Sequence, residues 1–174
     1  MKEINEVMNH KEAFDHILSC RGDINRQFIL KLQEIVTRNT LDDVIGDQTG
    51  RYRNVRVYIR GAEWMPPSPE DVPEDMNKLL SWHTRNRKKL HPLITASYFH
   101  VGFETVHPFV DGNGRVGRLL MNFILHRNGF PMVNIPESRE LEYYRCLEEG
   151  QNKGKLRPFI EFIYDLMMGS ELLF

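Results

Sequence analysis

The residues from His107 to Arg118 hold most of the side chains in this sequence that could perform chemistry on a phosphate. They read His-Pro-Phe-Val-Asp-Gly-Asn-Gly-Arg-Val-Gly-Arg. The Gly-Asn-Gly turn at residues 112–114 stands immediately before a predicted helix. Successive backbone N–H groups can therefore converge on an oxyanion at the positive end of the helix dipole. The segment predicts a phosphate-binding loop.

The side chains around this turn suit a polyphosphate. Arg115 and Arg118 are three residues apart in the first helical turn, so both guanidinium groups can lie near one another and bind phosphate oxygens. Asp111 offers a hard oxygen ligand for Mg²⁺, which commonly binds through one carboxylate and the phosphates of a substrate. His107 carries an imidazole that titrates near neutrality, as a general base requires.

Each of these residues also has a structural interpretation. A histidine before proline is often a capping or core residue, Gly-Asn-Gly is often only a tight turn, and Asp111 could cap the helix. The two arginines could pair with carboxylates. Because all of them occur together between two apolar segments, we favour the phosphate site. The sequence contains no Walker A, HExxH, kinase or nucleophile-elbow pattern, which excludes ordinary NTPase and kinase folds.

Two apolar segments flank the loop and must position it. Residues 90–104 and the residues after Gly114 have the spacing of helices that are buried on most sides, and we expect them to pack as a hairpin. Pro108 prevents the first helix from continuing into the second, so residues 107–114 form a constrained loop. The apolar positions are Leu93, Ile94, Phe99, Val101 and Phe103, followed by Val116, Leu119, Leu120, Phe123 and Ile124.

Further helices are predicted by the same spacing, over about residues 5–18, 24–36, 68–82, 138–149 and 158–168. Asp23 is the predicted cap of the second of these, and Ser68 begins the third. The first helix is expected to turn one apolar stripe toward the core, made of Val7, Met8, Phe14, Ile17 and Leu18.

Between Thr40 and Pro67 the apolar pattern changes to a period of two residues. Val55, Val57 and Ile59 alternate with polar or aromatic residues, which predicts a strand. Gly61-Ala62 can turn this strand, and residues 63–65 can return as the second strand of a small hairpin. An ordinary loop stabilised by Trp64 is an equal alternative.

Composition narrows the class of protein. The chain has 174 residues, 23 basic and 24 acidic, with a formal net charge of −1, so no global positive field recruits nucleic acid. We expect one domain over residues 1–174, because the sequence contains no repeat, linker or low-complexity tract. It also lacks a stretch long and apolar enough to span a membrane and a secretory signal, so we expect a cytoplasmic protein without a membrane partner.

Two smaller features carry little chemistry. Cys20 and Cys146 are too few for a disulfide framework, and we interpret both as buried thiols. The basic cluster Arg85, Arg87, Lys88 and Lys89 has no interleaved aromatic residues. It is more typical of a solvated helix end than of a nucleic-acid site.

The segment from His107 to Arg118 resembles the signature of the Fic domain family, His-Pro-Phe-x-[Asp/Glu]-Gly-Asn-Gly-Arg-x-x-Arg, at every fixed position. The similarity extends across most of the chain. Gly50-Arg51-Tyr52-Arg53, the alternating run after it and Pro66-Pro67 look like the family's flap. The resemblance implies an all-α helical bundle with a small β-hairpin flap at about residues 52–66.

The resemblance also implies an activity: transfer of AMP from ATP to a Tyr, Ser or Thr hydroxyl of a target protein, with release of pyrophosphate. His107 would be the base and Asp111 the Mg²⁺ ligand. Phosphate-binding residues would be Gly112, Asn113, Gly114, Arg115 and Arg118, with the Asn113 side chain at the α-phosphate. Tyr144 would lie by the adenine, with Gln151 or Asn152 near its edge. The target would pair with the flap at Val57, Tyr58 and Ile59.

Several alternatives stay open at this point. Within the same fold, the donor could carry UMP or phosphocholine, or the enzyme could remove AMP. A non-catalytic nucleotide-binding or interaction module, or a small nucleic-acid-binding protein, are candidates from other classes.

Regulation and assembly are also open. Many Fic proteins are inhibited by a helix with the pattern Ser/Thr-x-x-x-Glu-Gly/Asn, and the sequence contains no full match. We therefore expect an inhibitory helix upstream of Met1, an inhibitor supplied by a partner chain in the manner of an antitoxin, or an unrestrained protein. A homodimer is possible through Leu172-Leu173 and Phe174, although packing of these residues within the chain is the favoured interpretation.

Overall fold

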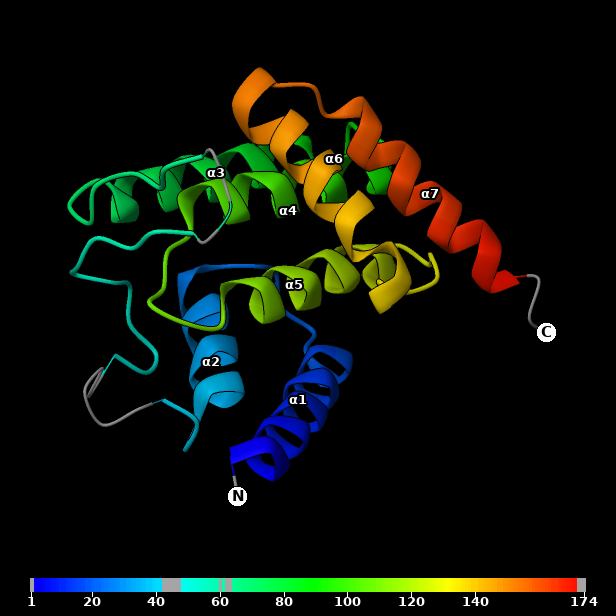
Figure 1. The fold of residues 1–174 in the computed structure, drawn as a ribbon. Coiled ribbons are helices and arrows are strands. Elements are labelled where there is room, and N and C mark those ends of the chain that lie inside the picture. The colour runs from blue at the N-terminus through cyan, green and yellow to red at the C-terminus, as the bar shows by residue number, and fades with distance from the viewer. Residues whose placement is uncertain (1, 42–47, 60, 62–63, 172–174) are drawn as a thin grey trace.

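Seven α-helices and one short 3-10 helix make up the described part of the computed structural model, which comprises residues 2–41, 48–59, 61 and 64–171 (Figure 1). In chain order they are α1 (Lys2–Ser19), α2 (Arg26–Thr37), α3 (Val72–Asn86), α4 (Pro92–Val106), α5 (Asn113–Arg127), η1 (Glu137–Arg139), α6 (Glu140–Lys153) and α7 (Arg157–Glu171). The predicted helical bundle is confirmed, and the helix bounds differ from the predicted ones by a few residues.

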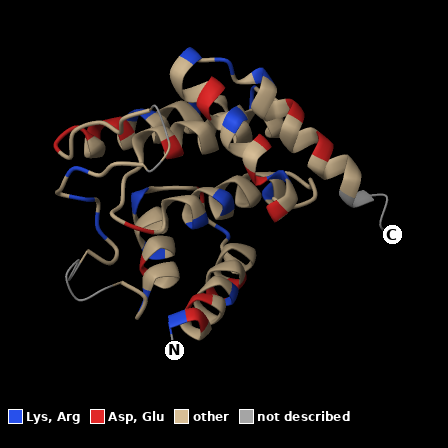
Figure 2. Ribbon diagram, in the orientation of Figure 1, with Lys and Arg blue, Asp and Glu red and all other residues tan. Residues whose placement is uncertain are grey.

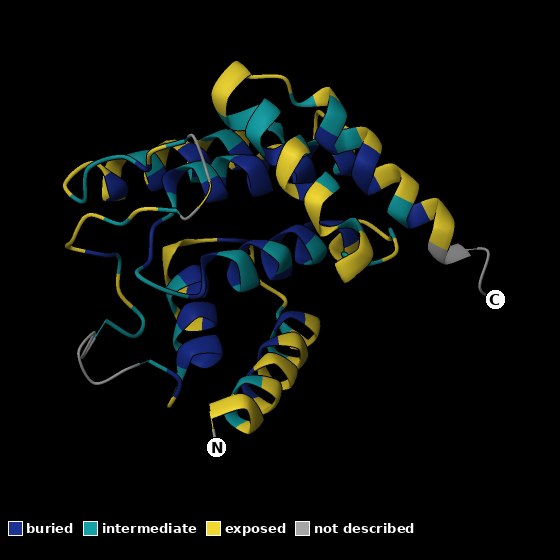
Figure 3. Ribbon diagram, viewed as in Figure 1, coloured by how far each residue is buried: buried dark blue, intermediate teal, exposed yellow. Residues whose placement is uncertain are grey.

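The predicted hairpin of α4 and α5 forms the centre of the fold. The two helices pack along each other, α1 and α2 lie against α5, and α3, α6 and α7 lie against α4 (Figure 1). Figure 3 shows the buried positions turned toward this central pair. Fully buried side chains from both helices include Phe99, Phe103, Leu120 and Met121. The glycine-rich loop before α5 therefore connects the two helices that pack most extensively on each other.

Helix α2 begins with a different cap from the predicted one. The Asn25 side chain accepts a hydrogen bond from the backbone N–H of Phe28 at 2.9 Å, which satisfies a free donor of the first turn. Asp23 instead forms an ion pair with Arg87 at the end of α3. The predicted cap was therefore wrong by two residues. The apolar residues that α2 buries are Phe28, Ile29, Leu32, Ile35 and Val36.

Helix α1 was predicted at the right place but with the wrong buried face. Ile17 is buried, whereas Val7 and Met8 are 70% and 62% exposed. Asn9 and Ala13 face the interior instead. The Asn9 side chain donates a hydrogen bond to the Arg38 carbonyl at 2.6 Å, just beyond α2. This polar contact and the small alanine set how α1 packs against α2.

The predicted β-hairpin is absent from the described residues of the 52–66 segment, which have no strand. Trp64 donates its indole N–H to the Thr105 carbonyl at 3.0 Å, and the Arg53 backbone N–H bonds to the Pro108 carbonyl at 2.9 Å. These bonds attach the segment to the end of α4 and to the loop after it. Ala62 and Glu63, in the predicted turn and return strand, lie outside the described residues.

The exposure of the two cysteines and of the basic cluster can be compared with the predictions. Cys20 and Cys146 are free thiols but only half-buried, so the prediction of fully buried thiols was wrong. Lys88 and Lys89 are exposed after α3, as predicted. Figure 2 shows basic and acidic residues interspersed along the helices. Among the described residues, no helix has the length and hydropathy needed to cross a membrane. The segment proposed as a dimer contact, Leu172–Phe174, lies outside the described residues.

Candidate active site

His107 ends α4 in an unusual backbone conformation. It is the C-cap residue, with φ of 48°, in the left-handed region that non-glycine residues rarely adopt. Its backbone N–H still bonds to the Phe103 carbonyl at 2.9 Å. The chain therefore turns sharply at this residue, and Pro108 follows and prevents further helix.

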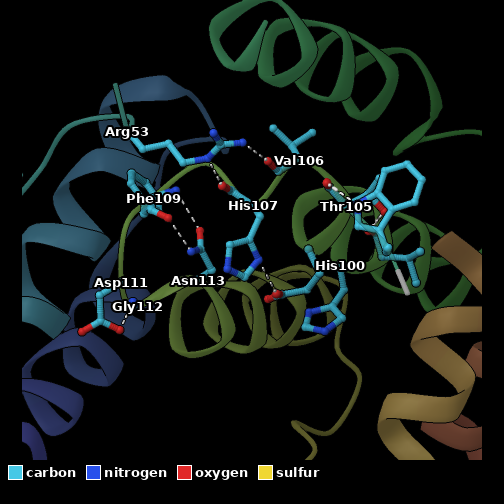
Figure 4. A network of polar contacts seen from close by, with 12 residues as sticks. Arg53, His100, Thr105, Val106, His107, Phe109, Asp111, Gly112 and Asn113 are labelled. Atoms are coloured by element: carbon cyan, nitrogen blue, oxygen red, sulfur yellow. Dashed lines mark hydrogen bonds and ion pairs between the residues drawn. The ribbon is translucent and has the colours of Figure 1, made fainter. Parts of the chain in front are cut away.

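The loop after His107 is closed by the side chain of Asn113. Its Oδ1 accepts from the Phe109 N–H at 2.9 Å and its Nδ2 donates to the Phe109 carbonyl at 2.8 Å (Figure 4). Because this buried amide braces the loop, Asn113 offers the site its backbone. The expected contact of its side chain with an α-phosphate stays a prediction.

Gly112 precedes α5 and faces the end of α2. Its φ is +87°, and a Cβ atom there would lie 3.0 Å from the Thr37 Cγ2. Both the conformation and the contact require glycine. The Gln33 side chain of α2 also donates to the Asp111 carbonyl at 3.3 Å and accepts from the Gly50 N–H at 2.5 Å. Helix α2 thus packs against the loop and holds it through the Gln33 side chain.

The charged side chains of the loop are partly paired with one another. Asp111 accepts from the Gly112 N–H at 2.6 Å and from Arg115 at 3.2 Å. Arg115 also donates to the Val36 carbonyl at 3.1 Å, which ties the first turn of α5 to α2. One of the structural interpretations, pairing of an arginine with a carboxylate, therefore holds for Arg115 alongside any contact with a ligand.

Two adjoining cavities contain most of the predicted site. A cavity of about 290 Å³ is lined by His107, Val110, Asp111, Gly112, Asn113, Gly114, Arg115, Arg118 and Tyr144. A second, of about 180 Å³, is lined by Ile59, Glu104, His107, Gly114, Arg118, Tyr143, Tyr144, Leu147, Glu148 and Gln151. The structure thus brings the predicted phosphate and adenine residues together. Val57, Tyr58 and Asn152 line neither cavity.

His107 is neutral at physiological pH. Burial, followed by the positive charge of Arg53, lowers the pKa of the imidazole to about 4. Its Nδ1 lies 3.7 Å from Oε2 of Glu104 on α4. Burial raises the pKa of Glu104 to about 7, and Arg118 opposes that shift only in part. The ring therefore turns Nδ1 toward a buried carboxyl group and leaves Nε2 as the nitrogen for the cavity.

The residues that could hold a metal ion are few. No group of three or more His, Cys, Asp and Glu side chains suited to a metal occurs among the described residues. Among the described residues that line the first cavity, Asp111 is the one carboxylate. A single carboxylate beside a phosphate site fits Mg²⁺, which completes its octahedral shell with phosphate oxygens and water.

Sequence analysis missed three buried polar residues that support the site: Gln33, Arg53 and Glu104. Each lies outside the recognised loop, and each is of a type that is usually exposed. Glu104 gave the clearest signal, because it follows a charge-free run of residues in a helix predicted to be buried. Arg53 belongs to the segment that resembles the family's flap, but neither Arg53 nor Gln33 gave a sign of burial, since only the packing of distant segments buries them.

Comparisons with known proteins agree with this geometry. The family model described as the Fic/DOC family matches residues 23–125. The protein adenylyltransferase Fic of Nematostella vectensis is 37% identical over 164 residues, which cover 92% of this chain and 37% of that protein. That of Drosophila melanogaster is 37% identical over 167 residues, covering 94% and 32%. This chain thus spans about a third of the length of these curated relatives.

Solved structures show the same fold. Fic-1 of C. elegans, residues 134–508, superposes with a TM-score of 0.84 at 33% identity, covering 98% of this chain and 50% of that one. The Fic domain of a Bartonella quintana effector, solved with bound ADP, has a TM-score of 0.74 at 16% identity, covering 94% and 83%, and shows the fold alone. Because family model, relatives and fold agree over most of its length, this chain belongs to the Fic/DOC family.

Proposed function

We propose that this chain transfers AMP from ATP to a Tyr, Ser or Thr hydroxyl of a target protein and releases pyrophosphate. The observation that carries the proposal is the position of the neutral His107, which lines both cavities. The glycine-rich start of α5 and Arg118 line these cavities as well. The names of the relatives, protein adenylyltransferases, support the same activity.

In this proposal the first cavity holds the phosphates. The backbone N–H groups of residues 112–114 stand at the positive end of the α5 dipole, where they favour an anion. Arg118 reaches back over Gly114, since a Cβ atom on that glycine would lie 3.2 Å from its Nη1. Its guanidinium can therefore bind oxygens of the β- and γ-phosphates, together with Arg115. Positioning and charge stabilisation supply most of the rate enhancement in such a transfer.

His107 acts as the general base. With a pKa of about 4 its imidazole is unprotonated at neutral pH and can accept the proton of the attacking hydroxyl. The oxygen then bonds to the α-phosphorus, the bond from that phosphorus to the bridging oxygen of pyrophosphate breaks, and the proton stays on the imidazole. Asp111 would hold Mg²⁺, which would offset the negative charge of the phosphates when bound.

The second cavity is the proposed site of the adenine. Tyr144 and Gln151 stand on α6, seven residues apart and therefore on one face of the helix, and both line this cavity. The Tyr144 hydroxyl bonds to Glu140 at 3.3 Å, one turn earlier, which limits the rotation of the ring. An aromatic face beside an amide suits the flat surface and polar edge of a base.

The target is proposed to approach along residues 57–59. Ile59 lines the adenine cavity, and Tyr58 is 75% exposed. A cavity of about 710 Å³ on the other side of residues 64–67 includes Thr105 and Val106, next to His107, and offers room for neighbouring side chains of a target. An extended segment could pair through its backbone, a mode that reads little side-chain sequence.

Incubation with ATP labelled on the α-phosphate tests the proposal. Label is expected to reach protein, including the enzyme itself, and His107→Ala should abolish the transfer. The matched control is His126→Ala, which removes an exposed histidine at the end of α5 and should transfer label like wild type. Transfer by His107→Ala at the wild-type rate would contradict the mechanism. Labelled UTP and CDP-choline at equal concentration would identify a different donor.

A further inference from the structure

Arg53 is a buried arginine whose hydrogen bonds go to four backbone carbonyls. Arg53 is 2% exposed, and its side chain donates to the carbonyls of Pro67 at 2.7 Å and Val55 at 3.2 Å. It also donates to the carbonyls of His107 at 2.8 Å and Val106 at 3.4 Å (Figure 4). A guanidinium loses much hydration energy on burial, so these bonds are needed to keep it in place. Its five donors form a rigid planar fork, which fixes the acceptors relative to one another.

The four carbonyls belong to two parts of the site. Val55 and Pro67 stand at the two ends of the segment that includes the proposed target-docking residues 57–59. Val106 and His107 form the end of α4 and carry the proposed base. A single side chain therefore connects both ends of the docking segment to the backbone of the base.

We propose that Arg53 is a positioning residue for the transfer, which holds the docking segment and His107 at a set separation so that a target hydroxyl reaches the imidazole. The inference rests on the function proposed above. Arg53 lines neither of the two cavities assigned to ATP, so its effect is on the second substrate and on the base rather than on the nucleotide.

Arg53 acts on His107 in two separable ways. Its Nε donates to the carbonyl of His107, a residue held in the left-handed region that non-glycine residues rarely adopt, and so stabilises that turn. Its charge also helps to keep the imidazole neutral, as the second cause after burial of the lowered pKa. The other titratable or charged groups that line the two cavities with His107 are Glu104 on α4, Asp111 just before α5, Arg115 and Arg118 on α5, and Tyr143, Tyr144 and Glu148 on α6.

Two substitutions separate geometry from charge. Arg53→Lys keeps the charge but cannot reach four carbonyls at once, and Arg53→Gln loses both. We expect kcat for label transfer to fall about 10- to 100-fold in both variants, because small misplacements of reacting groups have effects of this size. The dissociation constant for ATP should stay within about twofold, since no ATP contact is removed. The control Arg157→Gln removes an exposed arginine on α7 and should keep the wild-type kcat.

The pH profile distinguishes positioning from general loss of structure. A base works only when neutral, so transfer falls as pH drops through its pKa. Without the neighbouring cation that pKa rises, and the acid limb of Arg53→Gln should move up by about one pH unit, whereas that of Arg53→Lys should not. Titration of the His107 ring by NMR, which requires no activity, should likewise give a raised pKa in Arg53→Gln and an unchanged pKa in Arg53→Lys.

Three results would overturn the inference: wild-type kcat in both variants, a raised dissociation constant for ATP as the main effect, or an unshifted His107 titration in Arg53→Gln. If Arg53→Gln does not fold, kcat and the acid limb of Arg53→Lys decide whether the inference holds. The melting temperature of Arg53→Lys shows that this variant is folded. Absence of label transfer by the wild-type chain would instead contradict the proposed function, and the His107 titration would still test the contact with Arg53.

Discussion

Glu104 shows how burial changes a single ionisable residue in this protein. It is 5% exposed, its Oε1 has no hydrogen-bond partner, and a Cβ atom on Gly117 would lie 2.4 Å from that oxygen. Loss of hydration disfavours the charged form, which is why the pKa rises to about 7. A carboxyl group with this pKa stabilises the folded state most when it is protonated.

Replacement of Glu104 by glutamine should therefore change how stability depends on pH. Below the unfolded pKa of about 4.5 the wild-type carboxyl is protonated in both states. Between there and pH 7 the unfolded chain releases its proton first, so the wild type loses stability as pH rises. We expect Glu104→Gln to gain roughly 1–3 kcal/mol relative to wild type between pH 4.5 and pH 8, measured by urea unfolding.

The control for this experiment is Glu74→Gln. Glu74 is exposed on α3 and pairs with Lys78 at 3.0 Å, so its removal should change stability by less than about 0.5 kcal/mol at both pH values. Equal pH dependence in wild type and Glu104→Gln would show that the carboxyl is not held in its neutral form.

At the scale of the element, the start of α2 shows how one of two possible residues becomes the N-cap. Asp23 and Asn25 are both good cap residues, and the sequence alone favours neither by type. In the structure Asn25 caps α2, while Asp23 pairs with Arg87 at the end of α3. The two acceptors two residues apart thus have different roles.

Alanine substitutions test this division. Asn25→Ala should lower the free energy of unfolding by about 1 kcal/mol, because the Phe28 N–H loses its acceptor. Asp23→Ala removes an exposed ion pair and should cost less than about 0.5 kcal/mol. Urea unfolding of both variants at one pH makes the comparison. A larger loss in Asp23→Ala would return the cap to the residue predicted from sequence.

At the scale of the whole molecule, α1 packs on the α2–α5 side and shows where helical periodicity is insufficient. Its apolar residues occupy more than one face, so a pattern alone does not identify the buried one. Ile17 contacts the core and Val7 faces solvent. The exposed stripe also includes Ile4 and Met8.

This orientation predicts unequal effects of two similar truncations. Ile17→Ala should destabilise the fold by about 2–4 kcal/mol, since it leaves a cavity in the core. Val7→Ala should change stability by less than about 0.5 kcal/mol, because the side chain is already hydrated. Thermal and urea unfolding measure both. Similar losses in the two variants would indicate that α1 is rotated from the described position.

The sequence by itself determined the family and the candidate phosphate site, because the residues from His107 to Arg118 are consecutive. The local backbone sets the geometry of a glycine-rich turn before a helix. The backbone N–H groups and side chains that surround this turn come from neighbouring positions in the sequence. The flanking helices were likewise predictable, since the apolar residues of α4 and α5 repeat along the chain. The family, the central hairpin of α4 and α5, and the residues that line the first cavity could thus be predicted without the structure.

Only the tertiary structure decided which distant residues complete the site. Arg53 and Gln33 are polar residues whose burial depends on segments far away in the sequence, and no local pattern distinguishes them from surface residues. The same holds for the 52–66 segment, whose hydrogen bonds go to α4 and the loop after it rather than to a second strand. Burial and hydrogen-bond partners depend on which element packs opposite, and that choice is a property of the whole fold.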